Sequence, residues 1–161
     1  MLARDVSMQE LPPLRDLNEE VLPHVNSLSR GDIEHLHRHS ARFRVVDCEG
    51  EIAGFLIGFL PAADYASVNL RWFKEHYSNF VYVDRVIVAP NWRRRGVARL
   101  LYEDLEVYCR QNALDSITCE VHTDPPNPGS LVFHETMGFR EVEVMTTAGK
   151  SVSLLRKSLS G

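Results

Sequence analysis

The segment that most constrains this chain is an apolar run joined by a short loop to a long amphipathic helix. Phe80–Val88 has the length and the β-branched content of a buried strand, and Pro90 ends it because proline cannot donate to a strand ladder. Gly96–Gln111 follows, with its apolar residues at helical spacing. A strand followed at once by an amphipathic helix predicts a sheet whose faces are covered by helices.

Weaker patterns extend this unit on both sides. Upstream we predict a helix over Leu14–Ser27 that Pro23 interrupts, a short helix capped by Asp32, a hairpin of strands at Phe43–Val46 and Ile52–Leu60, and a partial helix around Leu70–His76. Downstream we predict a strand at Ser116–Val121, a helix at Ser130–Met137, and two strands at Phe139–Met145 and Ser151–Leu155. This order predicts an α/β (α+β) fold with one mixed sheet.

Composition sets the class of protein. The 161 residues, 44% of them hydrophobic, suffice for one core, so we expect a single domain over residues 1–161. A formal net charge of −4 argues against a nucleic-acid partner. Three cysteines without a CxxC pair fit a reducing compartment, and no apolar run approaches the length of a membrane span. We therefore expect a cytoplasmic protein with no membrane partner.

The loop between the strand and the helix favours an anion. The first turn of a helix has free N–H groups and the positive end of the helix dipole, and Gly96 lets an anion approach the backbone. Arg93, Arg94 and Arg95 add charge and forked donors. The loop lacks the endings of a Walker A or a Rossmann fingerprint. A pyrophosphate site is the favoured interpretation, and a solvated surface or an RNA contact is the alternative.

Two motifs carry a family resemblance. Arg93-x-x-Gly96-x-Ala98 after the strand resembles motif A of the GNAT superfamily of acyl-CoA-dependent N-acetyltransferases. Asn127-x-x-Ser130-x-x-Phe133-His134-x-x-x-Gly138-Phe139 resembles its motif B. Shorter stretches at Tyr82–Arg85, Asp124–Ser130 and Gly149–Val152 are similar to a little-described branch of predicted acetyltransferases.

The resemblance implies a fold and a co-substrate. The fold is a GNAT-like mixed sheet of six or seven strands, flanked by about four helices and splayed after the motif A strand. The co-substrate is acetyl-CoA, with its pyrophosphate on the N–H groups of 94–98 and its pantetheine arm paired with Val86 and Val88. The residues assigned to acetyl-CoA are Val86, Ile87, Val88, Arg93, Arg94, Arg95, Gly96, Val97, Ala98, Arg99, Asn127, Ser130, Phe133 and His134.

The resemblance also implies an activity. It is transfer of an acetyl group from acetyl-CoA to a primary amine of a small molecule, an amino acid or a peptide, by direct attack of the amine. The alternative is a non-catalytic acyl-CoA-binding module, because His134 stands where the family usually has a tyrosine acid. A homodimer through the terminal strands is compatible with the family.

Three residues are candidates for proton transfer. Asp84 is the first candidate for the base, and its alternative is an ion pair with a neighbouring arginine. Glu120 is the second, since it interrupts an apolar strand beside the splay. His134 is the candidate acid for the departing thiolate, and Val88 is the candidate amide for the thioester oxyanion.

Other polar residues give weaker hypotheses. His35 and His39 share a helix face, but no third ligand is evident, so we expect no metal site. We expect the acceptor between residues 32–39 and 65–77, where Arg71 and Lys74 would suit an acceptor with a carboxylate.

Overall fold

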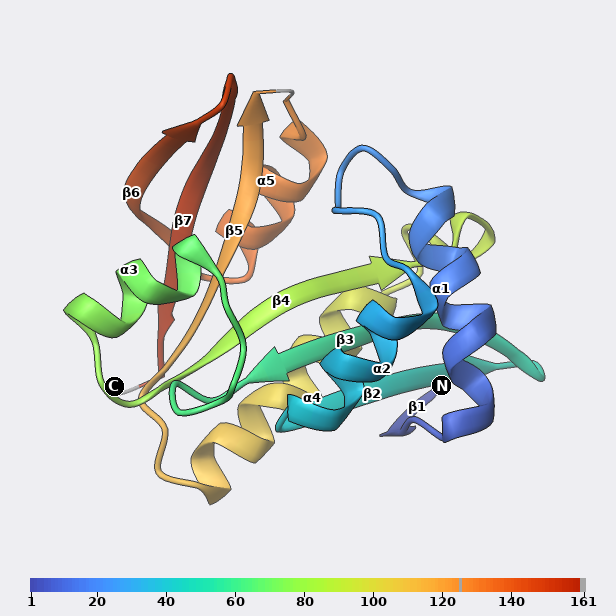
Figure 1. The fold of residues 1–161 in the computed structure, drawn as a ribbon. Coiled ribbons are helices and arrows are strands. Elements are labelled where there is room, and N and C mark those ends of the chain that lie inside the picture. Colours follow the sequence, from blue (N-terminus) through green and yellow to red (C-terminus); the bar gives the residue numbers. More distant parts are fainter. Residues whose placement is uncertain (125, 160–161) are drawn as a thin grey trace.

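In the computed structural model, residues 1–124 and 126–159 are described, and they form a seven-stranded sheet with five α-helices and two short 3-10 helices (Figure 1). The strands are β1 (Leu2–Asp5), β2 (Arg42–Cys48), β3 (Glu51–Phe59), β4 (Phe80–Val88), β5 (Ser116–Asp124), β6 (Arg140–Thr147) and β7 (Lys150–Ser158). Their order across the sheet is β1-β2-β3-β4-β5-β7-β6. Only the β4–β5 pair among them is parallel, so the sheet is mixed as the sequence predicts.

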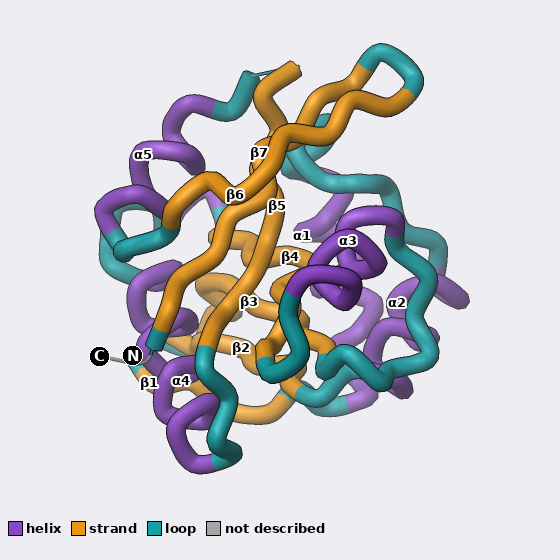
Figure 2. Tube along the Cα trace, turned by 90° about the vertical axis from the view of Figure 1, so that its left-hand side faces the viewer, coloured by secondary structure: helices purple, strands orange, loops and turns teal. Residues whose placement is uncertain are grey.

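The helices cover both faces of the sheet. They are α1 (Leu11–Glu20), α2 (Arg30–His39), α3 (Val68–His76), α4 (Val97–Gln111) and α5 (Pro128–Thr136), with 3-10 turns at Met8–Glu10 and Pro90–Trp92. Figure 2 shows α4 and α5 on one side of the sheet, and α1, α2 and α3 on the other. The predicted cap of α2 is wrong: Ser29 is the N-cap, and Asp32 is its partner in a capping box.

Two apolar clusters hold these layers together. One joins α1, α2 and α3 to the sheet through buried residues such as Leu14, Ile33 and Phe73. The other joins α4 to the opposite face through Leu101 and Leu105. The apolar stripe of α4 thus packs on β4, the strand that precedes it. This packing holds the loop between β4 and α4 in place.

The sheet splays between β4 and β5. The two strands pair only over Phe80–Tyr82 with Ser116–Thr118, and they separate beyond this point. On its other side, β4 pairs with β3 through a β-bulge: Ile57 faces Arg85 while Gly58 faces Val83, so Asp84 is the extra residue. The splay opens a cleft whose walls are the second halves of β4 and β5.

Most of the predicted elements are present. The mixed, splayed GNAT-like sheet is confirmed, with one helix more than expected. The sequence interpretation missed β1, a four-residue strand at the sheet edge. The α1 helix ends at Glu20, before Pro23 rather than across it. Pro125, within the 124–130 stretch, lies outside the described residues, as do 160–161 of the expected domain.

Candidate active site

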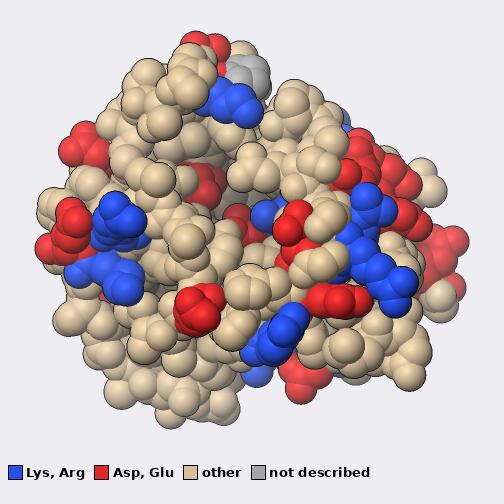
Figure 3. All heavy atoms as spheres, viewed as in Figure 1, with Lys and Arg blue, Asp and Glu red and all other residues tan. Residues whose placement is uncertain are grey.

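A cavity of about 710 Å³ lies in the cleft between the two strands. Its floor and sides come from β4, β5, the start of α4, α5, the α1–α2 loop and the segment that enters α3. On the corresponding face of the molecule, Figure 3 shows a hollow with acidic atoms at its bottom and basic atoms beside them. The cavity therefore connects the predicted anion site to a group of buried charges.

The α4 end of the cavity is built for an anion. Gly96 caps α4 with a left-handed φ of 83°, and a Cβ placed there would meet no atom within 4 Å. Arg94 also has a left-handed φ, of 62°. The earliest intrahelical bond runs from the Leu100 N–H to the Gly96 carbonyl, so the N–H groups of 97–99 lack partners within the helix. A pyrophosphate fits this open, positively polarised turn.

The three arginines of the loop point to different surroundings. Arg93 and Arg94 line the cavity, as does Ala98. Arg95 instead lies over the Trp92 ring, 5.0 Å from its centroid. Arg99 is exposed on the next turn and does not line the cavity, whereas the Val97 side chain is buried in the core, so only its backbone faces an anion.

The backbone of β4 offers free hydrogen-bonding groups to the cleft. The Ala89 N–H donates to the Ala53 carbonyl on β3. Because residues alternate along an antiparallel pair, Ile87 also points its backbone groups at β3, and those of Val86 and Val88 point the other way. Val86, Ile87 and Val88 all line the cavity. An extended amide-containing arm can therefore pair with Val86 and Val88 as an added strand.

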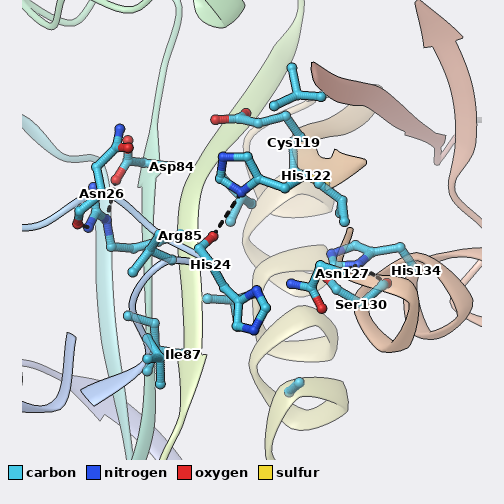
Figure 4. Close-up of a pocket in the computed structure, with 18 of the residues that line it drawn as sticks. His24, Asn26, Asp84, Arg85, Ile87, Cys119, His122, Asn127, Ser130 and His134 are labelled. Carbon is cyan, nitrogen blue, oxygen red and sulfur yellow. Dashed lines mark hydrogen bonds and ion pairs between the residues drawn. The ribbon is translucent and has the colours of Figure 1, made fainter. Parts of the chain in front are cut away.

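The α5 helix forms the opposite wall, with Asn127, Ser130, Phe133 and His134 lining the cavity (Figure 4). His134 is buried, and its Nδ1–H donates to the Ser130 carbonyl at 2.7 Å. Its Nε2 accepts from the Tyr102 hydroxyl, also at 2.7 Å. Burial lowers the pKa of the imidazole. The ring is thus neutral with both nitrogens occupied, which argues against the expected imidazolium acid.

Glu120 lies in the cavity with the properties of a base. Both of its carboxylate oxygens accept from the Tyr82 hydroxyl at 2.7 Å. Burial raises the pKa of Glu120 from 4.5 to about 7, although the hydrogen bonds from Tyr82 and Asn69 oppose that change. A carboxylate with a pKa near neutrality can accept a proton at physiological pH.

Asp84 is engaged elsewhere. Its carboxylate accepts from Arg85 Nε at 2.6 Å and from the Tyr65 hydroxyl, and only 5% of its side chain is exposed. Asp84 does not share a face with Val86, because the β-bulge breaks the alternation of β4. Of the two carboxylates, the geometry thus favours the second sequence candidate, Glu120, as the base.

The sequence reasoning missed several cavity residues. Arg85 is 8% exposed, and nothing in a strand pattern distinguishes it from a surface arginine. His24 and Asn26 come from the α1–α2 loop, and the His122 ring donates from Nδ1 to the His24 carbonyl at 3.0 Å, bridging the cleft (Figure 4).

Other predictions fall outside the cavity. Arg71 and Lys74 are exposed on α3 and do not line it, and neither does the 32–39 segment of α2. The centroids of the His35 and His39 rings lie 4.4 Å apart, with the rings tilted by 47°. Within residues 1–124 and 126–159 no group of three or more His, Cys, Asp or Glu side chains could hold a metal ion.

Comparison with known families identifies the fold. The model of the Acetyltransferase (GNAT) family matches residues 10–139. The chain belongs to the GNAT acetyltransferase family. Within this GNAT domain, the loop before α4 and the α5 wall correspond to the two motifs from which the resemblance was inferred. A search of curated proteins finds no match.

Solved structures agree on the fold of this GNAT protein. Ard1 from Thermoplasma volcanium superposes with a TM-score of 0.80 at 18% identity, covering 99% of this chain and 97% of that one. The ribosomal-protein-S18-alanine N-acetyltransferase from Escherichia coli gives 0.73 at 16% identity, covering 99% and 94%. YncA from Salmonella typhimurium, described as a putative acetyltransferase with its cofactor acetyl-CoA, gives 0.74 at 14% identity, covering 100% and 95%.

No helix in the described part of the chain is both long and apolar enough to cross a membrane.

Proposed function

We propose that this GNAT protein transfers an acetyl group from acetyl-CoA to the primary amine of a small molecule, an amino acid or a peptide. The observation that carries the proposal is one continuous cavity with an anion-binding helix terminus at one end and Glu120 at the other. The solved GNAT structure with acetyl-CoA supports the donor, and the S18-alanine N-acetyltransferase supports an amine acceptor. Because the three cysteines are free, we place the reaction in the cytoplasm.

The proposed reaction is a direct attack. The amine attacks the thioester carbonyl once Glu120 accepts its proton, directly or through a water molecule. The N–H of Val88, which points into the cleft, would stabilise the developing oxyanion. The C–S bond then breaks, and the CoA thiolate leaves with the pyrophosphate still held at the start of α4. Each of these groups lines the same cavity, so no rearrangement of strands is required.

The leaving group needs no acid from His134 in this scheme. The imidazole is neutral, and its single N–H group donates a hydrogen bond to the Ser130 carbonyl. Tyr102 donates to the same ring, and burial raises the pKa of its hydroxyl well above 10. We infer that this pair joins α4 to α5 and holds the wall that carries Asn127. The thiolate departs as the anion and takes a proton from solvent.

The occupied His134 also favours a second candidate, a GNAT domain that binds acyl-CoA without turning it over. Both candidates require CoA to bind, and only the enzyme releases the thiol. Calorimetric titration with acetyl-CoA, followed by a thiol-release assay with a panel of amines and peptides, separates them. Binding with release supports the enzyme. Binding without release from any acceptor supports the non-catalytic module.

A matched pair of variants identifies the base. Glu120→Gln should bind acetyl-CoA normally and lose about 10²- to 10⁴-fold in rate, the usual contribution of a positioned base. Glu103→Gln, an exposed substitution on α4 outside the cavity, should change neither quantity. Full activity of Glu120→Gln would remove the carboxylate from the mechanism.

A further inference from the structure

Arg85 occupies an unusual place in the sheet. The β-bulge at Asp84 shifts the alternation of β4, so that Arg85 points to the side of α1, where its guanidinium contacts Asn18. Its side chain is 6% exposed, yet it lines the cavity. Burying a guanidinium group lowers the stability of the fold unless the group is paired with a counter-charge and hydrogen-bonded. The partners of Arg85 therefore indicate its role.

Two of the three guanidinium nitrogens are occupied. Nε donates to Asp84 at 2.6 Å, and Nη1 donates to Asn18 Oδ1 at 2.7 Å and to the Asn26 carbonyl at 3.1 Å. Figure 4 shows Arg85 beside Asp84 and Asn26, on one side of the cavity. These contacts fix the plane of the group from a strand, a helix and a loop at once.

The third nitrogen, Nη2, is different. It makes no hydrogen bond with any residue in 1–124 or 126–159, and it is not among the buried side-chain atoms that lack a partner there. It is therefore accessible, and Arg85 has access to the cavity that it lines. A fixed, accessible N–H donor in the cavity that receives the amine substrate can bind an oxygen atom of that substrate.

We infer that Arg85 Nη2 binds the carbonyl oxygen next to the reacting amine, so that the preferred acceptor is the α-amine of a peptide. This inference rests on the proposed function and specifies its substrate class. Arg85, Asp84 and Glu120 all line the one cavity that would hold the acceptor.

Charge selects a carbonyl over a carboxylate. Asp84 already neutralises Arg85, and Glu120 must be anionic to accept a proton. A free amino acid would add a second uncompensated negative charge to the same cavity, whereas a peptide carbonyl adds none. The base also suits this acceptor, since a terminal α-amine has an ordinary pKa of about 7.7–8.0, against about 10.4 for an alkylamine such as lysine.

Three acceptors test the inference on the unmodified protein. They are a tripeptide amide, the same compound with its first peptide bond replaced by a trans-alkene, which removes the carbonyl without adding a second basic amine, and the free first amino acid. We expect kcat/KM for the peptide to exceed that of the alkene compound by about 10- to 100-fold, the effect of one hydrogen bond to a charged group. Equal values for these two, or the free amino acid as the best acceptor, would overturn the inference.

Variants locate the effect at Arg85. Arg85→Lys keeps the charge without the fork and should reduce the peptide preference to less than about threefold, while Arg71→Gln on the exposed face of α3 should keep it. A full preference in folded Arg85→Lys would also overturn the inference. If that variant does not fold, the comparison of acceptors on the natural chain still decides.

These experiments distinguish a failure of the inference about Arg85 from a failure of the proposed function. Thiol release with any amine supports the enzyme, whatever the order of acceptors. If no amine releases thiol, the enzyme proposal fails, and calorimetry of the two tripeptides on the CoA complex then tests Arg85 by binding alone. Tighter binding of the peptide than of its alkene analogue supports the carbonyl contact, and equal binding contradicts it.

Discussion

Removing the Tyr82 hydroxyl should move the pH dependence of the reaction. This hydroxyl donates to both oxygens of Glu120 at 2.7 Å, and it therefore stabilises the carboxylate over the carboxylic acid. In Tyr82→Phe the ring remains in the core and only the donor is lost. The pKa of Glu120, about 7 in the natural chain, should rise.

The size of the shift follows from the hydrogen bond. A hydrogen bond to a charged group contributes about 1.5–3 kcal/mol, and about 1.36 kcal/mol corresponds to one pKa unit. Loss of the Tyr82 hydroxyl should therefore raise the pKa of Glu120 by about one to two units. Because the base must be deprotonated to act, activity is lost as pH falls through this pKa, and the acidic limb should move to higher pH.

The assay is kcat/KM for thiol release between pH 5.5 and 9.5, with one acceptor throughout so that the ionisation of the amine cancels between variants. Tyr65→Phe is the matched control, since its hydroxyl donates to Asp84 rather than to Glu120. An acidic limb that stays in place in Tyr82→Phe, or that moves equally in Tyr65→Phe, would refute the assignment of Glu120 as the base.

Three further substitutions test other parts of the site. Gly96→Glu should abolish acetyl-CoA binding by calorimetry while the far-UV spectrum is retained, because a carboxylate enters the open space at the start of α4; unchanged affinity would exclude the anion site there. Asp84→Asn should keep the acidic limb but move it to lower pH, because the negative charge that raises the pKa of Glu120 is lost, and it should lower the free energy of unfolding in urea by about 3–5 kcal/mol, because it leaves Arg85 buried without a counter-charge; loss of the limb would restore Asp84 as the base. Tyr102→Phe should cost about 1–3 kcal/mol in the same unfolding experiment, because His134 loses its donor, and kcat should stay within about threefold; a large loss of kcat without loss of stability would make Tyr102 the acid.

The sequence could predict what depends on local pattern. Phe80–Val88 and the helix after Gly96 have unambiguous periodicity, and the observed β4 and α4 match them within one residue. The β1 strand could not be found, because Leu2–Asp5 is too short for a period to be recognised and is defined by its pairing with β2. The N-cap of α2 was predicted three residues too late, at Asp32 instead of Ser29, since both residue types are acceptable caps.

The candidate site likewise has one part that the local sequence predicts and another part that it does not. The turn at Arg93–Ala98 is a local property of the chain, so the start of the helix after Gly96 could be predicted, and its role in binding an anion stays a prediction. The order of the two carboxylates could not, because it depends on a β-bulge that rotates Arg85 into contact with Asp84. Bulges depend on tertiary pairing, and a period of two assigns the wrong face beyond them. The partners of His134 likewise come from a different helix.

The short pairing between β4 and β5 also governs how the molecule opens. Backbone hydrogen bonds join the two strands over only three residues of each, so the unit formed by β5, β6, β7 and α5 is held to β2–β4 mainly by side-chain contacts, including the apolar cluster around α4. Hydrogen bonds between Tyr82 and Glu120, between His24 and His122, and between Tyr102 and His134 also connect the two parts. A ligand that bonds to both walls adds to these side-chain connections. Amide hydrogens throughout the C-terminal unit should then exchange more slowly, including those far from the ligand.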